Sequence, residues 1–524
     1  MATCYGTDAY HYHSRLGSSL TGMRDRLRAL FETLVPQGSI AQQAAKSGVW
    51  MTVIRVFSQG SNILMLLILA RLLSPRYFGI LGLAMLTLSA SKQFTDIGIN
   101  TALVQQKAEN IDRYLNTAWV LNISRGVLLA AVLFFTAPFI AQFFGEADSS
   151  LTTVVRVIGL SPLIYGLQNP AIVYFQKDLD FHKEFVYQTA SSFVQFGVGI
   201  GYALVSPTVW ALVAGVISVN VSKVVLSYAL HDYRPWPSVD RAVLSELIDY
   251  GKWITAASIT QFIHSEGDDV FVGWFLSATA VGFYQYAHKI ADMPATQFTE
   301  VVSAVTFPAY SKLQDDPAAL RDAVFGTTRL VAVVAFPLSV GMALIAPSFV
   351  PVVLGDDWVP MVLPLQLLSV FGLLHAITRH FGGVFNALNR PDLNMKLDTV
   401  RIVCLAAIIW PATARWGLAG TAGAVIAVYL FPMFPLDVYV TSRLMEAHPF
   451  EIFSEYVYPA IGSAVMFGCL WYAQGLVDVS PLVELVLTVP AGAVVYTVSV
   501  LLLDELFSWG IKRDLRQVVA EVQS

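Results

Sequence analysis

Long apolar stretches alternate with short polar segments along almost the whole of this 524-residue chain. Val127–Phe144, Val186–Leu204, Val209–Leu230 and Leu482–Leu503 meet or approach the roughly 20 residues that a helix needs to cross a bilayer. Within lipid every backbone N–H and C=O must be satisfied internally, so a spanning segment is a helix or part of a closed barrel. Because these stretches are continuous rather than short and alternating, they predict helices.

The pattern predicts an all-α, polytopic membrane helix bundle with about fourteen transmembrane helices. The predicted spans are approximately 48–70, 78–103, 114–143, 151–175, 185–205, 208–230, 248–275, 282–306, 326–350, 361–388, 397–412, 417–441, 454–475 and 481–503. Composition agrees, because 56% of the residues are hydrophobic and only 13% are charged, against about 25% charged in soluble domains.

The basic residues fix an orientation for this bundle. If the N-terminus is cytosolic, most of the 32 lysines and arginines fall in inner segments, and only Arg71, Arg76 and Arg415 fall in outer loops. Cytosolic loops are the ones that carry an excess of Lys and Arg. The chain is therefore predicted to be a multi-pass protein of the cell (inner, cytoplasmic) membrane with both termini cytosolic.

Two segments of the chain match at an offset of 203 residues: ARLLSPRYFGILGLA (70–84) and GWFLSATAVGFYQYA (273–287). Leu73, Ser74, Gly79 and Ala84 correspond to identical residues in the second copy. Each copy joins two predicted spans at an outer turn, and an even number of spans separates them, which indicates parallel halves. A chance match between sequences of low diversity is the alternative.

This repeat suggests two pseudo-symmetric six-helix lobes plus two C-terminal helices. The predicted units are a cytosolic N-terminal tail (1–47), an N-terminal lobe (48–235), a C-terminal lobe (236–445), two additional transmembrane helices (446–503) and a cytosolic C-terminal tail (504–524). In two-lobe transporters the substrate path lies between the lobes near the midplane. The three scattered cysteines indicate neither a disulfide framework nor a metal site.

Several stretches follow one another in a characteristic order: LILARLLSPRYFGILGLA, GDDVFVGWFLSATAVGFYQYAHKIADMPATQF, VTFPAYSKLQDDPAAL, VVLGDDWVP and FNALNRPDLNMK. Together they resemble the polysaccharide transporter (oligosaccharide flippase) family of the multidrug/oligosaccharidyl-lipid/polysaccharide exporter superfamily. The resemblance covers roughly residues 45–445.

The resemblance implies a flippase that moves a polyprenyl-(pyro)phosphate-linked oligosaccharide from the cytosolic to the outer leaflet for cell-surface polysaccharide synthesis. Its partners would be this lipid-linked oligosaccharide, the lipid bilayer and candidate glycan polymerase or transferase machinery, and no nucleic acid. The expectation is a carrier without a cofactor, with H⁺ or Na⁺ as a candidate coupling cation.

Ionisable residues inside spans are costly and tend to face cavities or partners. Arg55 shares one helical face with Gln59 and Asn62, and Arg suits bidentate contact with a pyrophosphate. The alternative is that Arg55 reaches to the cytosolic headgroups, because it lies only a few residues into its span.

Lys92 and Arg125 are further candidates for the substrate cavity. Lys92 and Asp96 are spaced i, i+4, so an internal ion pair on one helix face is as good an interpretation as a substrate role. Arg125 follows Asn122 by about one turn. These cations make the N-terminal lobe suitable for an anionic headgroup.

The C-terminal lobe has a second set of intramembrane polar residues. His264, Lys289 and Arg379 are substrate-binding candidates, and Asp268, Asp269, Asp292 and His375 are candidates for ion coupling or structural pairs, as is Asp96. Asp268 and Lys289 could pair across the second repeat turn. His375 and Arg379 share a helix face, where a titrating histidine could gate transport or where both residues could simply approach the cytosolic side.

No catalytic motif is evident, because the chain has no Walker A, HExxH or GxSxG sequence. Asp356 and Asp357 of the GDDW segment are interpreted as a solvated outer turn. Two rival functions remain open: an ion-coupled multidrug/cation antiporter of the same superfamily, expected to have an acidic and aromatic cavity, and a membrane enzyme of glycan assembly.

Overall fold

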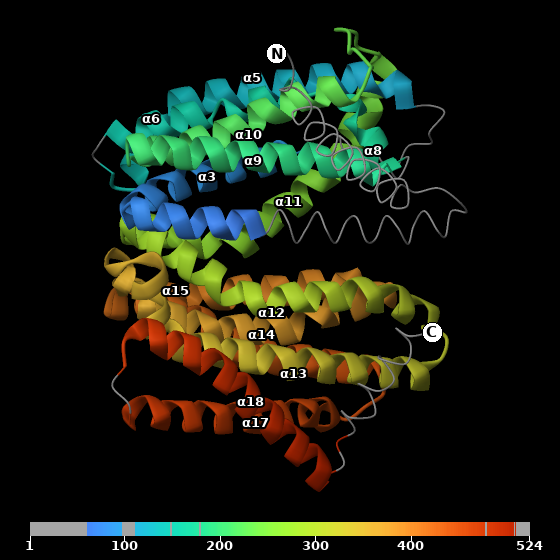
Figure 1. Ribbon diagram of the computed structural model, residues 1–524. Coiled ribbons are helices and arrows are strands. Elements are labelled where there is room, and N and C mark those ends of the chain that lie inside the picture. Colours follow the sequence, from blue (N-terminus) through green and yellow to red (C-terminus); the bar gives the residue numbers. More distant parts are fainter. Residues whose placement is uncertain are drawn as a thin grey trace, which may run out of the picture.

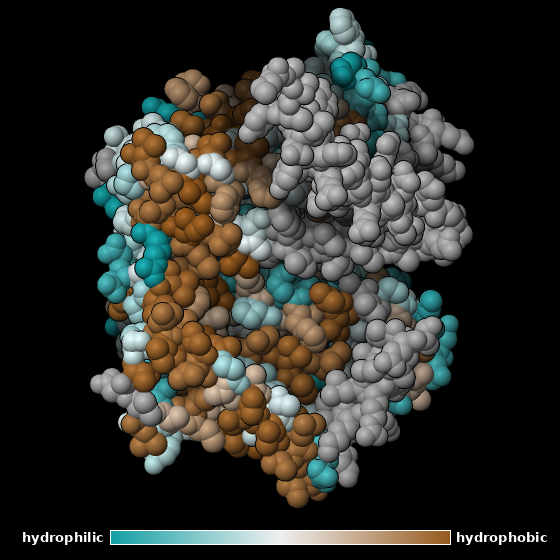
Figure 2. All heavy atoms as spheres, in the orientation of Figure 1, coloured by the Kyte–Doolittle hydropathy of each residue, from teal (hydrophilic) through white to brown (hydrophobic). Residues whose placement is uncertain are grey.

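The computed structural model describes residues 60–96, 111–146, 149–177, 180–476, 479–507 and 509. All regular elements in these ranges are helical. Among the described residues, six segments are long and apolar enough to cross a membrane: Tyr114–Phe143, Val209–Leu230, Pro317–Leu354, Asp356–Ala387, Pro391–Leu444 and Pro481–Phe507. Apolar side chains cover much of the visible surface (Figure 2), as expected where helices face lipid. The protein is a helical membrane bundle.

The helices gather in two groups, one above the other in Figure 1. The first group, here called the N-terminal bundle, comprises Gly60–Leu72, α3 (Pro75–Phe94), α5 (Ile111–Phe143), α6 (Ser149–Ile158), α7 (Ser161–Gly166), η2 (Pro170–Ile172), α8 (Val173–Lys177), α9 (Phe181–Val205) and α10 (Val209–Leu230).

The second group, here called the C-terminal bundle, begins with α11, which runs between the groups (Figure 1). It comprises α11 (Arg241–Phe275), α12 (Ala278–Lys312), α13 (Pro317–Phe349), η3 (Val350–Leu354), η4 (Asp356–Met361), α14 (Val362–Ala387), α15 (Pro391–Val428), η5 (Tyr429–Met433) and α16 (Phe434–Leu444). Two further helices, α17 (Pro449–Leu476) and α18 (Pro481–Phe507), pack against α13.

Where the structure describes them, the helices overlap the predicted spans, and two of these spans are interrupted. The span expected at 417–441 is interrupted at η5, where Phe431 is extended (φ −143, ψ 113). The span expected at 151–175 is broken into α6, α7, η2 and α8. Asn169 is extended (φ −67, ψ 116) and its side chain accepts a hydrogen bond from the Ala171 N–H. Because Pro170 lacks an N–H and disfavours helical geometry in the residue before it, the helix cannot continue through this point.

A single glycine separates the two spans predicted within α15. Gly417 has a positive φ of 57°, which only glycine adopts readily. The segments on either side run close together, since the Thr413 and Thr421 hydroxyls are 2.9 Å apart. A Cβ on Gly420 would lie 2.1 Å from the Ala412 carbonyl oxygen. The chain therefore reverses at Gly417.

The two repeated segments found in the sequence lie against each other. A Cβ on Gly79 would lie 1.7 Å from the Ala278 carbonyl oxygen, and a Cβ on Gly282 would lie 2.4 Å from the Pro75 carbonyl oxygen. Gly282 and Ala278 occupy the positions of Gly79 and Pro75 in the second copy. The contact is thus reciprocal, as between two copies related by a twofold axis.

Trp358 of η4 packs against both repeated segments and stabilises their contact. Its side chain is fully buried and its Nε1–H donates to the Ala70 carbonyl oxygen at 2.9 Å. The centre of its ring lies 5.2 Å from the ring centre of Phe78 and 5.4 Å from that of Tyr286. Arg71 donates to the carbonyl oxygens of Val352 and Val353. We call residues 70–84, 273–287 and 350–361 the junction; it joins the two bundles at one end.

The two acidic residues of the GDDW segment, unlike its tryptophan, are not buried. Asp356 and Asp357 are both exposed, in agreement with a solvated turn. The segment therefore holds its position through Trp358 and not through its charges.

Candidate functional site

Each of the two bundles contains a polar cavity among its described residues, and a further polar cavity lies between α13 and α17. The N-terminal cavity has a volume of about 310 Å³ and the C-terminal cavity about 610 Å³. Both hold residues that the sequence singled out.

The N-terminal cavity lies between α3, α5 and α7. Its lining consists of Ser89, Lys92, Gln93, Asp96, Asn122, Arg125, Gly126, Leu129, Pro162 and Tyr165. Three of the predicted residues, Lys92, Asp96 and Arg125, are therefore brought together here. The pocket follows from the broken helix, because Pro162 and Tyr165 belong to the short α7 that packs against α5.

The guanidinium of Arg125 binds the C-terminal end of α3. Its Nη2 donates to the Lys92 carbonyl oxygen at 2.7 Å and its Nε to the Thr95 hydroxyl at 3.0 Å. Its Nη1 lies 3.9 Å from the Asp96 carboxylate. A cation at a helix C-terminus is favourable, because the last carbonyls carry partial negative charge. Asp96 thus faces Arg125, where the sequence had suggested an ion pair with Lys92.

Lys92 is the cation of this cavity that remains available. Its ammonium makes no hydrogen bond or ion pair with any other described residue. Lys92 is exposed and lines the cavity together with the amides of Gln93 and Asn122. A compact ammonium beside amide donors suits a phosphate oxygen.

The C-terminal cavity lies between α11, α12, α14, α15 and η5. Its lining consists of Gln261, Ile263, His264, Ser265, Gly267, Asp268, Phe271, His288, Phe371, His375, Arg379, Asp398, Arg401, Ile402, Leu405, Ala406, Ile409, Trp410, Val425 and Tyr429. Four predicted residues meet here from two helices: His264 and Asp268 of α11, and His375 and Arg379 of α14.

One side of this cavity is built around Arg401 of α15. Its Nη1 lies 2.8 Å from Nε2 of His264 and 3.2 Å from the Asp398 carboxylate. The guanidinium lies over the Tyr429 ring, 4.5 Å from its centre. This combination of ion pair and cation–π contact fixes the guanidinium in the wall.

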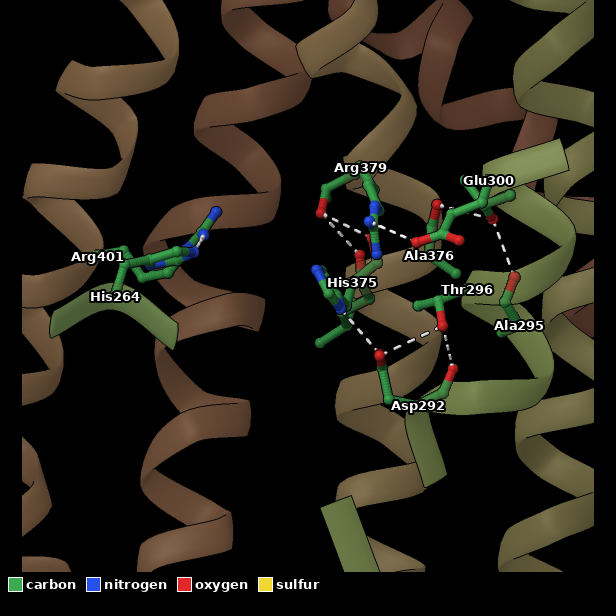
Figure 3. A network of polar contacts seen from close by, with 12 residues as sticks. His264, Asp292, Ala295, Thr296, Glu300, His375, Ala376, Arg379 and Arg401 are labelled. Carbon is green, nitrogen blue, oxygen red and sulfur yellow. Dashed lines mark hydrogen bonds and ion pairs between the residues drawn. The ribbon is translucent and has the colours of Figure 1, made fainter. Parts of the chain in front are cut away.

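The opposite side carries two pairs of charged or titratable groups between α12 and α14 (Figure 3). Nδ1 of His375 lies 2.8 Å from the Asp292 carboxylate, which also contacts the Thr296 hydroxyl at 3.3 Å. Arg379 donates to Glu300 at 2.8 Å. Of the predicted residues, Asp292 and His375 therefore form one pair, and Arg379 belongs to the other.

The remaining candidates lie apart from these networks. Asp268 accepts a hydrogen bond from the Tyr284 hydroxyl at 2.7 Å, and Asp269 is buried beside it. Lys289 is exposed and makes no ion pair among the described residues, so the predicted Asp268–Lys289 pair does not form. Asn62 is half-buried and lines neither cavity. Arg55 and Gln59 lie outside the described residues.

Sequence reasoning missed the pair on α15. Asp398 and Arg401 are spaced i, i+3. Arg401 was counted only among the basic residues of the inner segments, and Asp398 was not singled out. Their position within the predicted span 397–412 was the available signal, because two charges in one turn of a spanning helix need partners.

The comparisons with known proteins agree with this architecture. The family model described as "Polysaccharide biosynthesis protein" matches residues 68–363. The lipopolysaccharide biosynthesis protein WzxC of Escherichia coli is 24% identical over 75% of this chain and 79% of its own length. The probable low-salt glycan biosynthesis flippase Agl15 of Haloferax volcanii is 21% identical over 90% of this chain and 99% of its own length.

A solved structure shares the fold. The lipid II flippase MurJ in an inward closed conformation superposes with a TM-score of 0.69 at 12% identity, covering 88% of this chain and 98% of that one. At this identity the likeness concerns the fold alone.

Proposed function

This chain belongs to the polysaccharide biosynthesis protein family, and from that premise we propose that it is a flippase for a lipid-linked oligosaccharide. It carries a polyprenyl-(pyro)phosphate-linked glycan from the cytosolic to the outer leaflet of the cytoplasmic membrane. The names of the relatives, including a probable glycan biosynthesis flippase that aligns over 99% of its length, support this function.

The observation that carries the mechanism is the reciprocal junction. Two bundles meet through Gly79 and Gly282, which occupy equivalent positions, while each bundle holds its own polar cavity. Besides the junction, α11 contacts the N-terminal bundle through Val243 and Leu247, which pack on Tyr114 and Ala118, and through Thr255, which donates to the Asp96 carbonyl oxygen at 2.6 Å. Rocking of one bundle against the other, with the junction opening and closing, is the motion of alternating access. Opening of the junction would release the substrate on the outer side.

The proposed architecture has fourteen spans in two pseudo-symmetric six-helix lobes, 48–235 and 236–445, followed by two helices in 446–503. Both tails lie in the cytosol and the junction faces outside, because Arg71 and Arg76 are the basic residues nearest to it and most others fall on the opposite side. The protein acts as a carrier and passes the glycan to polymerase or transferase machinery.

Lys92 is the proposed ligand of the substrate phosphate, and Arg55 is a second candidate on the sequence evidence. The half-buried pair of Asp292 and His375 is the proposed site at which H⁺ or Na⁺ couples to transport, because the two groups lie 2.8 Å apart between α12 and α14. Asp268 and Asp269 are alternative carboxylates for the same role.

A leaflet assay on the host tests the function. The gene is deleted and spheroplasts are treated with membrane-impermeant periodate, which oxidises only sugars on the outer face, before the glycan-lipids are extracted. We expect complete glycan-lipid protected on the cytosolic leaflet, rescued by wild type and by Lys396→Ala, and not by Lys92→Ala.

Lys396 is the matched control because it is an exposed lysine of α15 that pairs with Asp392 at 2.8 Å and lines neither cavity. Accumulation of an incomplete glycan would contradict the carrier and indicate an assembly enzyme. An unchanged lipid profile with increased drug sensitivity would indicate a multidrug antiporter.

A further inference from the structure

We propose that the two cavities bind different parts of one substrate: the C-terminal cavity holds sugar rings of the glycan, whereas the N-terminal cavity holds the phosphate linker. This inference rests on the proposed function. It assigns the specificity for the glycan to residues of α11, α14 and α15.

The walls of the two cavities differ in aromatic content. Phe271, Phe371, Trp410 and Tyr429 line the C-terminal cavity, whereas Tyr165 is the aromatic residue among those lining the N-terminal cavity. A pyranose ring presents a face of C–H groups that packs well on an aromatic ring, and aromatic side chains supply large apolar area. A phosphate gains nothing from such a wall.

The charges of the C-terminal cavity compensate one another. Arg401 lies 3.2 Å from Asp398, and Arg379 lies 2.8 Å from Glu300. A polyanion entering here would have to compete with carboxylates that already hold both guanidinium groups. In the N-terminal cavity the Lys92 ammonium has no such partner among the described residues.

The C-terminal cavity also has polar atoms that need a partner. Nδ1 of His264 and Nε of Arg401 are buried and form no hydrogen bond within the described part of the chain. Buried polar atoms of this kind are uncommon in native structures. A sugar hydroxyl both donates and accepts, so it can satisfy a ring nitrogen and a guanidinium N–H alike.

The dimensions fit the assignment. The volume of about 610 Å³ lies within the range of about 300–1,000 Å³ typical of small-molecule sites. The two polar groups and the aromatic side chains lie on the walls of the same cavity, which gives a sugar an apolar face and hydrogen-bonding edges together.

Two probes separate the parts of the substrate. The full-length protein in nanodiscs is titrated with undecaprenyl pyrophosphate, which has no sugar, and with the reducing oligosaccharide released from the host's glycan-lipid by mild acid, which has no phosphate. Binding is measured by calorimetry for wild type and for variants with unchanged thermal unfolding.

We expect Trp410→Leu and His264→Ala to weaken binding of the oligosaccharide at least tenfold and to change binding of undecaprenyl pyrophosphate less than twofold. Lys92→Gln should have the opposite effect. Trp416→Leu, at an exposed tryptophan outside the cavity lining, and Lys396→Gln are the matched controls and should behave as wild type.

Each contrary outcome has its own meaning. Oligosaccharide binding that falls with Lys92→Gln but not with Trp410→Leu or His264→Ala would overturn the division between cavities. So would a wild type that binds undecaprenyl pyrophosphate and no oligosaccharide, although the flippase function would survive. A wild type that binds neither probe would contradict the flippase function itself.

Discussion

The junction and the interface between α13 and α17 hold the molecule together by different means. At the junction, Gly79 and Gly282 bring two backbones into contact, and Trp358 contributes one N–H bond to Ala70. Between α13 and α17, Arg321 pairs with Glu451, and Arg329 forks onto both oxygens of Glu455 at 2.8 and 3.1 Å. One contact depends on shape and the other on charge.

This difference indicates which contact moves. Separating the junction breaks few hydrogen bonds and leaves no buried charged group without its ion-pair partner. Its closed and open forms can therefore have similar free energies. Separating α17 from α13 would break the ion pair between Arg329 and Glu455, whose side chains are only 14% and 10% exposed. Trp509 adds an N–H bond to Glu455 at 2.9 Å. We expect α17 and α18 to move with the C-terminal bundle.

The largest effect should come from the charged interface. Glu455→Gln removes the carboxylate to which Arg329 donates two hydrogen bonds, and breaking a buried ion pair costs about 3–5 kcal/mol. We expect a lower thermal unfolding midpoint in detergent and faster proteolysis within α17 and α18. Asp392→Asn is the control, because its partners Arg390 and Lys396 form an exposed network, and it should unfold like wild type. Equal behaviour of the two variants would show that the α13–α17 pairs are dispensable.

The next effect should come from the glycine contact. Gly79→Ala places a Cβ 1.7 Å from the Ala278 carbonyl oxygen, and overpacking of this kind costs about 1–3 kcal/mol. Because that cost falls on the closed junction, we expect a population with longer distances between spin labels at Ser149→Cys and Asp357→Cys, in a background without native cysteines.

Gly341→Ala is the matched control, because a Cβ at Gly341 meets nothing within 4 Å. Alanine is favoured over glycine in a helix by about 1 kcal/mol, so this variant should be as stable as wild type or more so, with unchanged label distances. An unshifted distribution in Gly79→Ala would argue against the junction as the moving contact.

A smaller effect is expected from the tryptophan. Trp358→Phe keeps most of the ring packing against Phe78 and Tyr286 but removes the bond to Ala70, which is worth about 1 kcal/mol. The same label pair should report a fewfold rise in the open population. Trp416→Phe, at a residue that is 66% exposed, should leave the distribution unchanged. A greater shift with Trp416→Phe than with Trp358→Phe would contradict the assigned role of Trp358.

The fold could largely be predicted from the sequence because its signals are local or repeated. Continuous apolar stretches gave the helices, and the match at an offset of 203 residues located the two segments that now meet through Gly79 and Gly282. The break at Pro170 was missed, since a proline within an apolar stretch is also common in unbroken membrane helices. The count of fourteen spans stays a prediction.

The candidate site was harder to predict because pairing is a tertiary property. Arg125 lies in a cavity as predicted, yet its donors are held by Lys92 and Thr95 at the end of α3, thirty or more residues away in sequence. Arg401 became part of a cavity wall through His264 of α11 and Tyr429 of η5. No spacing within one helix reveals such partners.

The smallest effect tests whether charge contributes to the junction at all. Arg71 is exposed and donates to the carbonyl oxygens of Val352 and Val353. Arg71→Lys keeps the positive charge but loses the fork that reaches two carbonyls at once, and at an exposed position we expect a cost below about 1 kcal/mol. The label distances should change less than in Trp358→Phe, and the small change should be insensitive to salt because the acceptors are neutral. A larger, salt-dependent shift would mean that the junction, like the α13–α17 interface, is held by charge, and the distinction between a moving and a permanent contact would lose its physical basis.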